Sequence, residues 1–191
     1  MPLKIITPEK PTEEVVGKSV FVVGPIIGAP ADWFAILKSH FEVYANKYNV
    51  DITVITNRNE SDHEEIESAL QKRYIENFPW ILEKLAHALQ NGYVLICLPK
   101  PIEKVQSYAE FARYVLPIAL HANLHEGAKV VISHEKDFQF SPYLQAHLES
   151  ADAALKTHSI ESAVETICRN AVSAHLQIQV NRTERYDSML D

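Results

Sequence analysis

The run Lys18-Ser-Val-Phe-Val-Val-Gly24 is rich in β-branched and aromatic residues, and Pro25 follows it directly. The residues from Val20 to Val23 are all apolar and lack the polar alternation of a strand that faces water on one side. A continuous apolar run that ends in a Gly-Pro turn is typical of a strand buried on both faces. Such strands belong to parallel sheets, whose two faces are covered by helices.

Similar apolar runs alternate with helical patterns along the chain. Further strands are expected at residues 51–56, 93–98 and 128–133 and near Leu155, and helices at residues 32–48, 77–91, 107–127 and 159–176. This alternation predicts an α/β fold with a doubly wound, mostly parallel five-stranded sheet, a flavodoxin- or Rossmann-like three-layer sandwich. Ligands of such folds bind at the carboxyl ends of the strands.

The length of the chain, 191 residues, fits one domain with a sizeable core. Residues 1–17 hold three prolines, at positions 2, 8 and 11, and are expected to form an arm with little regular structure. The α/β domain is predicted to span residues 18–178, and the polar residues 179–191 to form a tail.

Charge and composition narrow the class of partner. A net charge of −7 with scattered basic residues argues against nucleic-acid binding, which needs clustered Lys and Arg. The longest apolar block is too short to cross a membrane, and two widely spaced cysteines favour buried, reduced thiols. We therefore expect a soluble, cytoplasmic protein whose ligand is a small molecule.

The first predicted strand ends in Gly24-Pro25-Ile26-Ile27-Gly28, at the expected ligand edge. This turn lacks the glycine spacing of a dinucleotide-binding fingerprint and the Lys-Ser/Thr pair of a P-loop. A nicotinamide or triphosphate site is not expected here, and no cofactor is predicted. Gly24 instead permits a tight turn and the close approach of a small ligand to the backbone, and the alternative is a purely structural turn.

The order of several short motifs is more specific than any one of them. They are Val20-Phe-Val-Val-Gly-Pro-Ile26, Asp32-Trp33, Ile55-Thr-Asn-Arg58, Asn77-Phe-Pro-Trp80, Val94 to Pro99, and Ala109-Glu110-Phe111. In this order the chain resembles the nucleoside 2-deoxyribosyltransferase family and its deoxynucleoside-hydrolase-like relatives over residues 18–170.

The resemblance implies cleavage or transfer at the N-glycosidic bond of a nucleoside or nucleotide. Glu110 is then the carboxylate nucleophile that forms a covalent glycosyl intermediate, and Asp32 protonates or orients the departing base. The remaining substrate-binding residues implied are Gly24, Pro25, Ile26, Trp33, Asn57, Arg58, Trp80 and Ser107. The family also implies a homo-oligomer.

Each of these residues has a structural alternative. Ser107-x-x-Glu110 is also a helix capping box, and Asp32 is also a suitable helix N-cap. Trp33 and Trp80 are equally interpreted as core residues, and Arg58 as a surface residue.

Two further interpretations stay open. His121 and His125 have helical spacing for a metal, but no third ligand accompanies them, so no metal site is predicted. Ile81 and Phe111-Ala112 replace residues of the family pattern, which leaves a second hypothesis, a non-catalytic module that binds or senses a nucleotide-like ligand.

Overall fold

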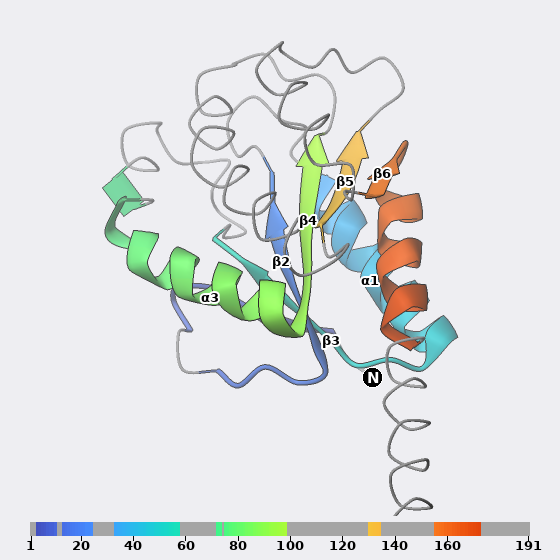
Figure 1. Cartoon of the computed structure of the whole chain (residues 1–191), viewed down its shortest axis with the longest axis horizontal. Coiled ribbons are helices and arrows are strands. Elements are labelled where there is room, and N and C mark those ends of the chain that lie inside the picture. Colours follow the sequence, from blue (N-terminus) through green and yellow to red (C-terminus); the bar gives the residue numbers. More distant parts are fainter. Residues whose placement is uncertain are drawn as a thin grey trace, which may run out of the picture.

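A computed structural model describes the parts of the chain that form the sheet and most of its covering helices (Figure 1). The described residues are 3–10, 13–24, 33–57, 72–73, 75–98, 130–134 and 155–172. Within them no helix is long and apolar enough to cross a membrane.

The centre of the fold is a six-stranded parallel sheet with the order β1-β3-β2-β4-β5-β6. The strands are β1 (Lys4–Ile6), β2 (Lys18–Val23), β3 (Ile52–Thr56), β4 (Gly92–Leu98), β5 (Val130–His134) and β6 (Leu155–Thr157). The helices are α1 (Trp33–Tyr48), α3 (Phe78–Asn91) and a C-terminal helix over residues 160–172. The order of the last five strands is that of flavodoxin-like sheets, so the predicted α/β class is confirmed.

The strand β1 corrects the prediction for the N-terminal arm. Residues 4–6 pair in parallel with β3, and Ile6 is completely buried. The expectation of little regular structure in residues 1–17 is therefore wrong for this segment, and the sheet has six strands instead of five. The flanking prolines limit the length of the strand, but they leave three residues free to pair with the edge of β3.

The two faces of the sheet are covered by different helices, as Figure 1 shows for α3 and the C-terminal helix. Val20, Val22 and Val54 belong to one buried cluster with side chains from α1 and the C-terminal helix. Because side chains alternate along a strand, Phe21 and Ile96 point to the opposite face, where α3 packs against β2 and β4. The sheet is thus buried on both sides, as the apolar run of β2 predicts.

The passage from α3 into β4 has no intervening loop. The helix ends at Asn91, and Gly92 is both its C-cap and the first residue of β4. A Cβ atom at Gly92 would lie 1.8 Å from the carbonyl oxygen of Ser19, so only glycine lets β4 approach β2 here. The predicted stop at Asn91-Gly92 is confirmed.

The C-terminal helix begins where its sequence predicts. The hydroxyl of Ser159 accepts a hydrogen bond from the backbone N–H of Ser162 at 3.1 Å, which is the geometry of an N-cap. The predicted end near residue 176 and the polar tail 179–191 lie outside the described residues.

Candidate functional site

The strand order places a topological switch point between β2 and β4. The chain leaves β2 through α1 to reach β3 on one side, and it leaves β3 through α3 to reach β4 on the other. Open α/β sheets bind ligands in the crevice outside the carboxyl ends of the strands at such a point. Gly24 follows β2 at this edge, beside the end of β4, and the arrowheads of β4 and β5 in Figure 1 mark the same edge.

Gly24 is in close contact with the first residue of α1. A Cβ atom at this position would lie 2.6 Å from Cη2 of Trp33 and 3.2 Å from the carbonyl oxygen of Cys97. The glycine therefore lets the backbone of the turn pack on the indole ring. Trp33 itself is only 3% exposed and makes an edge-to-face contact with Phe34, with ring centroids 5.7 Å apart. Trp33 is thus packed as a core residue, which is the structural alternative to a substrate-binding role.

Asn57 and Asn77 form a second feature of the same edge. Asn57 follows the last residue of β3, and Asn77 is the N-cap residue of α3. The side-chain Nδ2 of Asn77 donates a hydrogen bond to Oδ1 of Asn57 at 3.3 Å, and both residues are half-buried. The start of α3 is thereby joined to the carboxyl end of β3.

Trp80 lies in the first turn of α3. Its indole Nε1 is buried and has no hydrogen-bond partner among the residues that the structure describes, although a buried indole N–H ordinarily finds one. The next residue, Ile81, is 1% exposed and packs in the core beneath the helix. The first turn of α3 thus carries a buried indole N–H without a partner among the described residues, and the next side chain along the helix packs in the core.

Several residues implied by the sequence lie outside the described part of the chain. They are Pro25, Ile26, Asp32, Arg58, Ser107, Glu110, His121 and His125. Of the implied site residues, Gly24, Trp33, Asn57 and Trp80 are described, and they come from the ends of β2 and β3 and the first turns of α1 and α3.

A histidine pair at the carboxyl ends of β5 and β6 was not among the sequence-based candidates. The ring of His134, the last residue of β5, meets the ring of His158 edge-on at a centroid distance of 5.0 Å. Each histidine ends or follows a strand, which is the signal that points to this edge. Among the described residues, no three His, Cys, Asp or Glu side chains gather as a metal site would require.

The two cysteines are buried and unpaired, as expected for reduced thiols. Burial raises the pKa of the Cys97 thiol far above its ordinary value, and burial also raises the pKa of Cys168 to about 12. Because the thiolate is the reactive form, neither side chain is a nucleophile at neutral pH.

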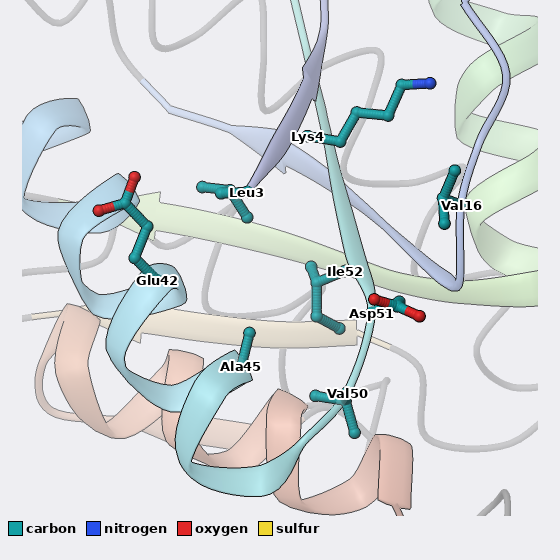
Figure 2. Close-up of a pocket in the computed structure, with 8 residues that line it drawn as sticks. All are labelled: Leu3, Lys4, Val16, Glu42, Ala45, Val50, Asp51 and Ile52. Carbon is teal, nitrogen blue, oxygen red and sulfur yellow. The ribbon is translucent and has the colours of Figure 1, made fainter. Parts of the chain in front are cut away.

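A pocket of about 370 Å³ opens at the opposite end of the sheet (Figure 2). Leu3, Ala45 and Ile52 surround it between α1 and the strands β1 and β3, and the carboxylates of Glu42 and Asp51 lie at opposite ends. Ile52 begins β3, whereas Asn57 follows its end, so this hollow is separate from the switch-point edge.

No protein-family model matches the chain, and no curated protein matches it either.

Proposed function

We propose that the switch-point edge binds a nucleoside or nucleotide and that Glu110 cleaves its N-glycosidic bond. The observation that carries the proposal is the close-packed glycine at the end of β2, in the order of motifs that resembles the nucleoside 2-deoxyribosyltransferases. The amide pair of Asn57 and Asn77 at the neighbouring strand end supports a polar ligand that is neutral or weakly charged, and so does the net charge of −7.

The proposed reaction has two steps. A carboxylate oxygen of Glu110 bonds to the anomeric carbon while the bond from that carbon to the base breaks, and the leaving base takes the electron pair. Asp32 supplies the proton that the base needs. Water or a second base then attacks the anomeric carbon and releases the Glu110 carboxylate, and the proton that the acceptor loses returns to Asp32. Hydrolysis and transfer therefore differ only in the acceptor.

A second candidate is a binding module that retains the pocket and lacks catalysis. The specific observation in its favour is Ile81, which replaces a glutamate of the family pattern and is buried in the core beneath α3. Both candidates require a nucleoside-like ligand, and only the first requires base release.

The test is to incubate the protein with a panel of nucleosides and nucleotides, with and without free acceptor bases, and to follow base release by chromatography. We expect release by the wild-type protein and a loss of at least about a hundredfold in Glu110→Ala, since the covalent route is removed. Glu83→Gln, on the exposed side of α3, is the matched control and should keep full activity.

Absence of release from every substrate, with nucleosides still bound, would favour the binding module. Unchanged release in Glu110→Ala would show that another group is the nucleophile.

A further inference from the structure

The side chain of Asn77 does not form the hydrogen bond that is usual for a helix N-cap residue. An asparagine at a helix N-cap ordinarily accepts a hydrogen bond from an N–H of the first turn, which stabilises the helix by about 1 kcal/mol. Asn77 makes no such bond, and its amide instead reaches the side chain of Asn57, twenty residues earlier in the chain. A capping residue ordinarily has a non-helical backbone, whereas Asn77 has helical φ −88° and ψ −1°, and its side chain contacts the carboxyl edge of the sheet instead of the first turn of α3.

This contact determines which atoms of Asn57 remain available. An asparagine amide has one carbonyl acceptor and one NH₂ donor group, and Asn77 engages the acceptor of Asn57. The Nδ2 group of Asn57 makes no hydrogen bond within the described part of the chain, and the residue is half-buried. A donor at the end of β3 is thus held in one orientation and left open.

We propose that Asn77 is a positioning residue that orients the Asn57 amide so that its Nδ2 donates to a hydrogen-bond acceptor on the base of the ligand. This inference rests on the proposed function and assigns a specificity determinant to that site. The acceptor is the carbonyl oxygen at position 6 of a purine base or position 4 of a pyrimidine base, a group to which an amide NH₂ can donate.

The bond between the two amides is neutral, so the orientation of Asn57 does not depend on pH. A site that uses a fixed donor discriminates against a ligand without the matching acceptor, because the donor is then left unpaired.

The test compares nucleoside affinity by calorimetric titration in the wild-type protein and four variants. In Asn77→Asp the ionised side chain has no donor, and in Asn77→Ser the hydroxyl is one bond shorter than the amide that reaches Oδ1 of Asn57 at 3.3 Å. Asn57→Asp replaces the proposed donor by an acceptor. Asn91→Ser, at the other end of α3, is the matched control. The probes are two pairs of nucleosides. Purine riboside lacks the base carbonyl of inosine, and cytidine has an amino group in place of one carbonyl of uridine.

We expect wild-type protein to bind a nucleoside that carries the acceptor. Both Asn77 variants should bind it about tenfold more weakly, the effect of one ordinary hydrogen bond, and Asn57→Asp should bind it more weakly still. The loss should vanish for the partner probe without the acceptor and should be absent in Asn91→Ser. The side-chain amide signals of Asn57 in ¹H–¹⁵N spectra should move in both Asn77 variants.

The failures are distinguishable. If wild-type protein binds no nucleoside, the proposed function fails, and the recognition role of Asn57 fails with it. If wild-type protein binds but the Asn77 variants bind equally well, or lose affinity equally for both members of a probe pair, the positioning role is wrong while the proposed function stands.

Discussion

At the scale of single residues, Gly24 and Trp33 show how local packing sets the geometry of the switch-point edge. We predict that Gly24→Ala lowers the free energy of unfolding by about 1–3 kcal/mol, because the new methyl group overlaps the indole ring. Urea titration measures the change. In a Trp33→Phe background the same substitution should cost about 1 kcal/mol less, since phenylalanine lacks Cη2 and Cζ2. Equal costs in the two backgrounds would show that the ring is not the obstacle.

Part of the candidate site could be predicted from single residues of the sequence. Gly24 and Asn57 were expected at the ligand edge because each follows an apolar run, and the strands that precede them are confirmed. The contact of Asn57 with Asn77 was not predicted. It joins positions twenty residues apart, and it depends on where the start of α3 settles against β3. The His134 and His158 contact likewise depends on the pairing of β5 with β6.

At the scale of elements, polar contacts join α1 to the C-terminal helix above their shared apolar core. Oε1 of Glu165 accepts hydrogen bonds from Nζ of Lys47 and from the hydroxyl of Tyr48, each at 2.9 Å. Nearby, the hydroxyl of Tyr44 donates to Oε1 of Glu161 at 2.8 Å. Contacts between residues more than a hundred positions apart thus connect two helices on one face of the sheet.

These contacts predict a pH dependence of stability. The hydrogen bond from Lys47, followed by that from Tyr48, lowers the pKa of Glu165 below its ordinary value of 4.5. A lowered folded-state pKa means that the stabilisation is complete above the unfolded-state value and is lost as the pH falls through the folded-state value. The difference in unfolding free energy between wild type and Glu165→Gln should therefore be present at pH 7 and shrink below about pH 4.5.

Urea titrations between pH 3 and pH 7 measure this difference. Glu14→Gln, a change at an exposed glutamate, is the control and should follow the wild-type profile. A difference for Glu165→Gln that stays constant down to pH 3 would show that its charge does not contribute.

Strands and helices whose own residues carry a clear pattern were predicted correctly. The strand β1, which depends on its pairing with β3, was not. The strands β2, β3 and β4 carry β-branched apolar runs, and α3 carries Pro79 near its start and Gly92 at its end. The strand β1 has only three residues and lies between Pro2 and Pro8 in the sequence. It becomes a strand through its pairing with β3. Local propensity contains no information about that partner.

At the scale of the whole molecule, β1 has a protective role at one edge of the parallel sheet. All five residues of β3 are buried, and β1 pairs with its outer edge from Lys4 to Ile6. Without β1, the N–H and C=O groups along one edge of the β-branched strand β3 would be exposed, and such an edge is a template for pairing with another chain. Because β1 is short and carries Lys4, it is a poorer template for pairing with another chain than the edge of β3 would be.

We therefore predict that deletion of residues 1–7 increases self-association, in addition to removing the buried side chain of Ile6. Sedimentation velocity over a range of concentrations should show larger species than the wild-type protein forms. Ile81→Ala is the control, because it loses about 2–5 kcal/mol from the core beneath α3 while the edge of β3 stays covered. Its sedimentation should match wild type at temperatures where both are folded. If the deletion variant sediments as wild type does, the uncovered edge does not promote association. If Ile81→Ala associates equally, association follows from lost stability and not from the uncovered edge.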